Sequence, residues 1–243
     1  MLLFLRKLHR IWLFTCLAFS YLLFYPFLKI ACRNPVKNYN RIAWYRRTMA
    51  LTGFYLACIY FKTNFSTKLD WNKAYILCAN HSSFLDIAIL TYICPTGFSF
   101  IGKEELTKVP AIGIFFRTID IAVKRESKIS SFKAYQRSNE LLKNGKSVVI
   151  FPEGGIDDQF PPKLQDFKSG AFRLAIENNV PIVPIIIQNA WEILFDDGKK
   201  RGSRPGIVHI DILDPIDTLQ YAEQDFDDVE KLVFEKMKES WSI

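Results

Sequence analysis

The spacing of the hydrophobic residues changes near residue 70. Before that point they form two long uncharged runs, residues 11–28 and 48–61, as expected for helices that contact lipid or pack in a core. As a helix, the first run would be about 27 Å long, just enough to cross the hydrocarbon core of a bilayer. The second would reach only about 21 Å, so we expect it to be membrane-embedded or packed in a core.

From residue 70 onward, short apolar runs alternate with amphipathic stretches. The short runs, rich in Ile and Val, predict strands at 74–79, 98–101, 119–123, 147–151, 182–187 and 207–213. The amphipathic stretches predict helices at 84–92, 129–143, 170–178 and 226–238. This alternation is typical of an α/β fold with a largely parallel or mixed sheet flanked by helices. We therefore expect a membrane-associated helical segment over residues 1–69 and an α/β domain over 70–243.

The charges follow the same division. Residues 1–69 contain eleven Lys and Arg and no Asp or Glu, whereas the remainder contains 21 basic and 25 acidic residues, so the net charge of +7 comes from the first segment. A basic segment is one signature of nucleic-acid binding. The apolar runs around it instead favour an anionic membrane surface, where each basic residue contributes about 1 kcal/mol. Membrane lipids are therefore expected partners, and nucleic acid is not.

Basic residues flank the first apolar run on both sides, which leaves its topology open. A single span is one arrangement. We prefer a helical hairpin, or two helices lying partly in one leaflet, because it keeps every basic residue on the cytoplasmic side. Residues 34–47 would then connect the helices, beginning with Pro35, and Trp44 and Tyr45 would lie at the interface.

Polar side chains follow three of the predicted strands. The three clusters comprise residues 80–86, Lys124 with Arg125, and residues 152–155. Because ligands of parallel sheets bind outside the carboxyl ends of the strands, we expect the clusters to converge. Asp86 lies five residues after His81, so its carboxylate can accept from one ring nitrogen and leave the other as a general base. In the alternative, His81 caps a helix and Asp86 is a solvated acid.

The sequence lacks the patterns of several other enzyme classes. It has neither the G-x-S-x-G elbow of α/β hydrolases nor a G-x-G-x-x-G dinucleotide motif. Its three His residues lack the spacing of metal ligands, and its five Cys residues form no CxxC pair. No metal site and no disulfide framework are expected.

The clusters resemble the motifs of the bacterial 1-acyl-sn-glycerol-3-phosphate acyltransferase (PlsC-like) family, within the glycerolipid acyltransferases. Asn80-His81-x4-Asp86 is similar to the family's NHx4D signature. Segments 119–125, 151–154 and 180–184 are similar to the other three motifs, in the family's order. The resemblance covers residues 72 to 214, and the family's membrane-bound two-helix element is similar to residues 1–69.

The resemblance implies a PlsC-like acyltransferase fold and a reaction. His81, oriented by Asp86, would remove the proton from the free hydroxyl of a lyso-glycerolipid, whose oxygen attacks the thioester of acyl-CoA or acyl carrier protein. No cofactor beyond this acyl donor is implied. The expected substrate-binding residues, some taken from the family and some from neighbouring segments, are Arg125, Glu153, Gly154, Gly155, Lys103, Lys168 and Arg173.

The third motif departs from the family pattern. It usually reads EGTR, whereas Gly155 and Ile156 replace the Thr and the Arg here, so one phosphate-binding cation is missing. Lys168 or Arg173 would supply the charge, or the acceptor would be a lyso-aminolipid or another lysophospholipid. We expect lysophosphatidate, acylated to phosphatidate for phospholipid synthesis at the cytoplasmic membrane, with the active site facing the cytoplasm. A thioester or ester hydrolase and a non-catalytic lipid-binding protein are the alternatives from other classes.

Overall fold

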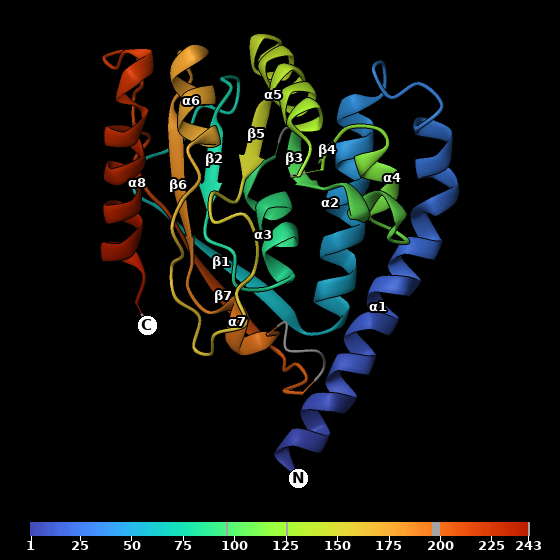
Figure 1. Ribbon diagram of the computed structural model, residues 1–243. Helices are drawn as coiled ribbons and strands as arrows, with labels where there is room; N and C mark the ends of the chain where they lie inside the picture. The colour runs from blue at the N-terminus through green and yellow to red at the C-terminus, as the bar shows by residue number, and fades with distance from the viewer. Residues whose placement is uncertain (96, 125, 196–199, 243) are drawn as a thin grey trace.

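The computed structural model describes residues 1–95, 97–124, 126–195 and 200–242, in which seven strands form one sheet with helices on both faces (Figure 1). The strands are β1 Ile59–Phe65, β2 Ile76–Ala79, β3 Phe98–Lys103, β4 Ile121–Val123, β5 Ser147–Ile150, β6 Ile182–Ile187 and β7 Gly206–Ile212. The helices are α1 Leu2–Ala31, α2 Tyr39–Leu56, α3 Leu85–Ile93, α4 Gly113–Phe116, α5 Lys128–Lys143, α6 Gly170–Glu177, α7 Ala190–Ile193 and α8 Phe226–Ser240, with the 3-10 turns η1 Glu104–Lys108 and η2 Glu223–Asp225.

The sheet is mixed but largely parallel, which confirms the predicted fold class. The strand order is β1-β7-β6-β2-β5-β3-β4, and only the β6–β7 pair is antiparallel among the strands of the described chain. Every residue of β2 and β6 is buried. Strands covered on both faces need apolar side chains at every position, which explains the uninterrupted apolar run at 182–187.

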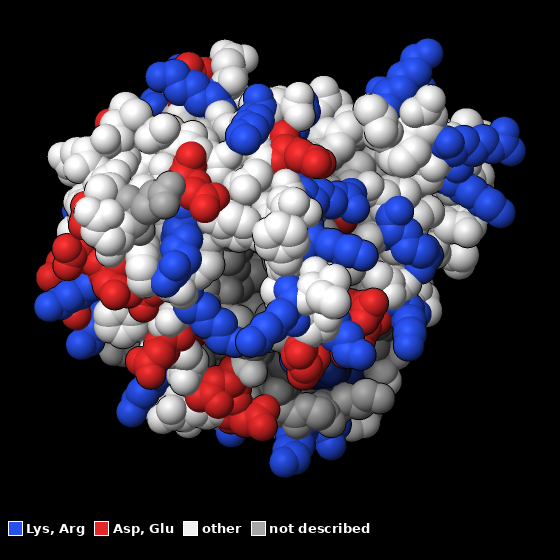
Figure 2. All heavy atoms as spheres, turned by 45° about the horizontal axis from the view of Figure 1, so that its top comes forward, with Lys and Arg blue, Asp and Glu red and all other residues white. Residues whose placement is uncertain are grey.

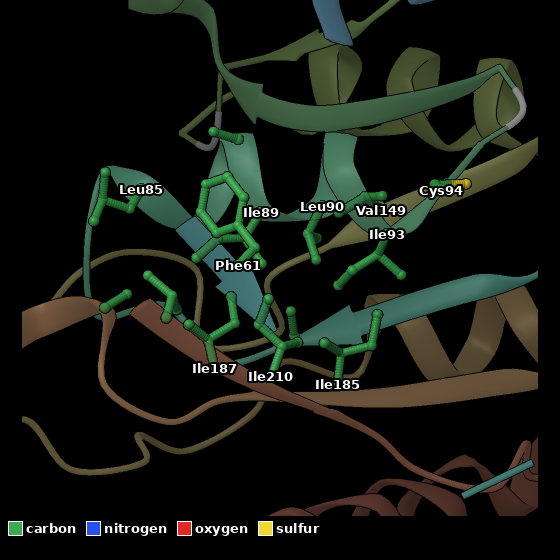
Figure 3. Close-up of a cluster of buried hydrophobic side chains, with 14 of the residues drawn as sticks. Phe61, Leu85, Ile89, Leu90, Ile93, Cys94, Val149, Ile185, Ile187 and Ile210 are labelled. Carbon is green, nitrogen blue, oxygen red and sulfur yellow. The ribbon is translucent and has the colours of Figure 1, made fainter. Parts of the chain in front are cut away.

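Alternate residues of the central strands face two different cores. Leu77 of β2 joins a core beneath α3 and the α1–α2 pair, whereas Ile76 joins a core beneath α5, α6 and α8. Figure 3 shows the first core, where Ile89 and Ile93 of α3 lie over strand residues such as Ile187. Beyond the carboxyl ends of β2 and β5, the chain continues as the turn before α3 and as the long 151–169 segment before α6.

The helix predicted over 48–61 is wrong at its carboxyl end. α2 ends at Leu56, and residues 59–65 form the edge strand β1, which runs parallel to β7. Ile59 and Phe61 are buried while Tyr60 between them is exposed, which is the alternation of a half-buried strand. The absence of charge through Phe61 concealed this alternation. The sheet therefore begins before the predicted boundary at residue 70.

α1 and α2 pack against each other as a helical hairpin (Figure 1), which is the packing that the preferred topology requires. Their connection is shorter than the predicted 34–47, because α2 already begins at Tyr39. The helices approach closely at Gly53, where a Cβ atom would lie 2.7 Å from Leu17 Cδ2. A side chain at position 53 would therefore push the two helices apart.

α1 presents an apolar face to its surroundings. Within the described chain, α1 is the one helix long and apolar enough to span a membrane, and 22% of its most apolar window is buried. Its exposed apolar residues are Leu2, Leu3, Phe4, Leu5, Leu8, Ile11, Trp12, Phe14, Phe19, Leu22, Leu23, Phe27 and Ile30. Exposed apolar surface of this extent is typical of a membrane or protein contact.

A buried ion pair joins the hairpin to the sheet. Arg46 of α2 places Nη1 2.6 Å from Asp120 Oδ1 and donates from Nη2 to the Phe98 carbonyl at 2.8 Å. Its guanidinium carbon lies 4.2 Å from the centroid of the Phe98 ring. Asp120 also accepts from the Phe100 N–H at 2.9 Å. Because both charged groups are buried, each depends on the other for compensation.

Replacing Arg46 by Met is expected to lower the free energy of unfolding by about 3–5 kcal/mol, since Asp120 would keep an uncompensated buried charge. The double variant Arg46→Met/Asp120→Leu should recover part of that loss. Urea denaturation of the full chain in detergent, followed by circular dichroism, measures both. If the free energy of unfolding falls by less than about 1 kcal/mol in the single variant, as for an exposed pair, the buried pair does not stabilise the contact between the hairpin and the sheet.

Candidate active site

The site begins where β2 ends, with an asparagine that imitates backbone pairing. The side-chain amide of Asn80 donates to the Ile187 carbonyl at 3.1 Å and accepts from the Ile187 N–H at 2.7 Å. Asn80 is completely buried. These two bonds tie the end of β2 to the end of β6 and direct the following turn away from the sheet.

Asp86 organises that turn. Its Oδ2 accepts from the backbone N–H groups of Ser82 at 2.7 Å and Ser83 at 2.8 Å, and lies 2.9 Å from His81 Nδ1. The carboxylate is fully buried in the first turn of α3, where the helix dipole also favours negative charge. The predicted His81–Asp86 contact is confirmed. An ionised Asp86 makes Nδ1 the protonated nitrogen, so Nε2 carries the lone pair.

The imidazole of His81 is held in its plane by an aromatic ring. The rings of His81 and Phe151 stack with centroids 4.0 Å apart and an angle of 16° between their planes. Phe151 follows β5 directly, so the stack joins the turn after β2 to the turn after β5. The His81 side chain is 14% exposed, which leaves it mostly covered but accessible to a bound substrate.

Glu153 connects three segments of the site. Its Oε1 accepts from the His81 N–H at 2.7 Å and its Oε2 from the Gln165 N–H at 2.9 Å. Burial raises the pKa of this carboxyl to about 7, although both hydrogen bonds act in the opposite direction. Since both oxygens are engaged by backbone groups, the geometry makes Glu153 a positioning residue for His81.

Lys168 lies against the glycine turn of the third motif. Gly154 has a φ of +82°, which a residue with a side chain rarely adopts, and a Cβ there would lie 2.8 Å from Lys168 Nζ. The Lys168 N–H donates to the Pro152 carbonyl at 3.0 Å. A Cβ at Gly155 would meet nothing within 4 Å. The ammonium group therefore stands over the turn that lacks the family's arginine, beside open space.

A family model described as Acyltransferase matches residues 58–188, more than half of the chain. The chain belongs to the acyltransferase family. It is 36% identical over 140 residues to a 1-acyl-sn-glycerol-3-phosphate acyltransferase of Chlamydomonas reinhardtii, covering 57% of this chain and 41% of the relative.

Two further similarities are informative. A 1-acyl-sn-glycerol-3-phosphate acyltransferase of Saccharomyces cerevisiae is 32% identical over 151 residues, covering 60% of this chain and 48% of the relative. The chain thus spans less than half the length of these two curated relatives. The crystal structure of the 1-acyl-sn-glycerophosphate acyltransferase PlsC from Thermotoga maritima aligns with a TM-score of 0.75 at 22% identity, covering all of both chains. It shows that the acyltransferase fold is shared.

The remaining predicted substrate residues of this acyltransferase lie in different places. Arg173 stacks its guanidinium 3.5 Å from the centroid of Phe226, where α8 begins, so the charge over the glycine turn comes from Lys168. Lys103 is exposed at the carboxyl end of β3. Arg125 lies outside the described residues. Its neighbour Lys124 follows β4, which runs parallel to β3.

Figure 2 shows one face of the molecule, where Lys and Arg side chains are mixed with Asp and Glu side chains around a hollow. A face of mixed sign gives no broad positive field, so selection of an anionic group depends on individually placed cations. Lys168, whose backbone N–H is bonded to Pro152 and whose ammonium lies beside Gly154, is one such cation.

Two contributors to the site were not predicted. The Gln165 N–H supports Glu153 through the backbone, so no side-chain pattern could have signalled it. Phe151 was noted within a motif, but its stack on His81 follows only from the pairing of β2 with β5. An aromatic residue directly after a buried strand was the available signal.

Glu153 should make the stability of the acyltransferase depend on pH. Its pKa of about 7 in the folded chain exceeds the ordinary 4.5, so its contribution is fully present below pH 4.5 and is lost as the pH rises through 7. The stability of the wild type relative to Glu153→Gln should therefore fall between about pH 5 and about pH 8. Denaturation of both proteins across this range measures the difference, and a difference independent of pH would contradict the expectation.

Proposed function

We propose that this acyltransferase transfers an acyl chain from a thioester donor, acyl-CoA or acyl carrier protein, to the free hydroxyl of lysophosphatidate, and so forms phosphatidate. The observation that carries the proposal is the buried Asp86 carboxylate on His81 Nδ1, with Lys168 over the neighbouring glycine turn. The names of the relatives support the same substrate class.

In the proposed reaction His81 acts as a general base. Its Nε2 takes the hydroxyl proton as the hydroxyl oxygen attacks the thioester carbonyl, and the Asp86 carboxylate stabilises the imidazolium that forms. A carbon–oxygen bond forms and the carbon–sulfur bond breaks. The departing thiolate takes the proton back from Nε2, which yields the ester, the free thiol and neutral His81. No covalent acyl-enzyme is required.

Lys168 is proposed to bind the acceptor phosphate, together with backbone N–H groups around Gly154 and Gly155. Lys103, at the end of β3, is proposed as a further contact, as is Arg125, which lies outside the described residues. Both donor classes fit the chemistry, because the attacked group is a thioester in each.

We further propose that the reaction takes place at a membrane, on its cytoplasmic side. The exposed apolar face of α1 supports this, as does the basic charge of residues 1–69. Lipid acceptors reside in the membrane, so a hairpin held there would bring the site to its substrate.

Replacing His81 by Ala should lower the rate of acyl transfer about 10²–10⁴-fold, since a general base contributes about that much. The assay uses purified full chain in detergent with lysophosphatidate and, separately, acyl-CoA and acyl carrier protein. The control is His209→Ala, which removes an exposed histidine from β7. Equal rates in the two variants would exclude His81 as the base. Free fatty acid released without any acceptor would instead indicate a hydrolase.

Replacing Lys168 by Gln should raise the KM for lysophosphatidate about tenfold with little change in kcat, because one charge-assisted contact to phosphate is lost. Lys163→Gln, an exposed lysine of the same segment, is the control. A neutral lyso-lipid should show no such dependence on Lys168. If neutral or zwitterionic acceptors are acylated well and lysophosphatidate is not, the missing arginine of the third motif has changed the acceptor.

A further inference from the structure

A pocket lies at the opposite edge of the sheet from His81. Its volume is about 440 Å³, and it lies between α2 and the amino ends of β2, β3 and β5, where their arrows start in Figure 1. The residues that matter for its chemistry are Asn40, Trp44, Arg47, Trp71, Asn72 and Lys146. His81 and Glu153 follow the carboxyl ends of β2 and β5, so the sheet separates the pocket from the proposed acyl-transfer site.

Lys146 and Arg47 bring two cations to the pocket, and neither is in an ion pair with another described residue. Neither Asp nor Glu is among the described residues that line it. Lys146 Nζ lies 3.2 Å from Asn40 Oδ1 and 5.3 Å from the centroid of the Tyr39 ring, and both partners are neutral. The nearby Asp70 carboxylate accepts from the backbone and side-chain N–H groups of Asn72 and does not line the pocket.

Arg47 brings a second positive charge to the pocket. Its Nη2 donates to the Tyr92 carbonyl at 3.3 Å, and its Nε is buried out of reach of a ligand in the pocket, so the charge and the remaining Nη donors are what a ligand would meet. An anion in the pocket would compensate the guanidinium charge. A phosphate suits the guanidinium best, because its oxygens match the geometry of the arginine donors.

The aromatic residues indicate where such an anion would come from. Trp44 is 55% exposed on α2, and Trp71 lines the same pocket. Indole rings are enriched at the level of lipid headgroups, where one side is apolar and the other is wet. The pocket also adjoins the hairpin whose other helix, α1, exposes an apolar face.

We infer that this pocket binds a phosphate group, either in the headgroup of an anionic lipid or as free phosphate, independently of acyl transfer. The Lys146 ammonium and the Arg47 guanidinium bind the phosphate oxygens. Asn40 already accepts from Lys146 through Oδ1, which leaves its Nδ2 as a further donor. The two indoles contact the glycerol or the first methylenes of a lipid.

The intrinsic tryptophan fluorescence, to which Trp44 and Trp71 contribute beside three other tryptophans, provides the measurement, taken also in the Trp44→Phe/Trp71→Phe variant, which should lose the response. Full-length protein in a non-ionic detergent is titrated with inorganic phosphate and, separately, with a water-soluble short-chain phosphatidylglycerol, against sodium chloride at equal ionic strength. Lys146→Gln should raise the dissociation constant about tenfold. Lys143→Gln, which removes an exposed lysine from the end of α5, should bind as the wild type does. Arg47→Gln, on α2, is a second variant and should weaken binding in the same way.

The two ligands distinguish the sources of the phosphate. A response to inorganic phosphate that Lys146→Gln weakens supports a site for free phosphate. A response to the lipid alone, weakened in the same variant, supports a headgroup site. The inference is overturned if neither ligand gives a response, or if Lys146→Gln and Lys143→Gln bind with the same affinity. Acyl transfer by Lys146→Gln to a soluble acceptor should equal that of the wild type, so a failure of the proposed function is detected separately.

Discussion

The buried carboxylate of Asp86 constrains how this acyltransferase can fold around its site. A buried carboxylate must be compensated by hydrogen bonds, and three donors converge on its Oδ2 here. Two of them are the consecutive N–H groups of Ser82 and Ser83, which reach the same atom only because the chain turns sharply before α3. The turn therefore depends on the carboxylate, and the orientation of His81 depends on the turn.

Hydrogen bonds between side chains and backbone groups also connect the segments around this turn. The His81 N–H is held by Glu153, whose other oxygen holds Gln165, and Asn80 is bonded to Ile187. These contacts connect the segments after β2, β5 and β6, all at one edge of the sheet. Asn80 is buried and Glu153 is half-buried, and removing either acceptor would leave a backbone N–H of the site unpaired. The site is thus a continuation of the sheet's hydrogen bonding by side chains.

Contacts between residues that are close in the sequence could be predicted, whereas contacts between distant segments could not. The His81–Asp86 pair spans five residues and could be predicted from spacing, as could the strand at 182–187 from its uninterrupted apolar run. The edge strand β1 was missed because its partner β7 is far along the chain and its own alternation is short. The choice of Lys168 over Arg173 depends on α8, whose Phe226 holds the arginine, and no local pattern records that contact.

Consecutive arginines on α2 connect these features to the α1–α2 hairpin. Successive helix residues are rotated by about 100°, so Arg46 and Arg47 face different surroundings. Arg46 enters the buried pair with Asp120 beside β3 and β4, while Arg47 lines the pocket at the amino ends of the strands. The ion pair fixes the rotation of α2 about its axis, and that rotation places Arg47 in the pocket. Because α1 packs against α2, the apolar face of α1 is then fixed relative to the sheet. The sheet in turn carries the site at its carboxyl edge, so a hairpin held in lipid would also set the orientation of His81 toward the membrane.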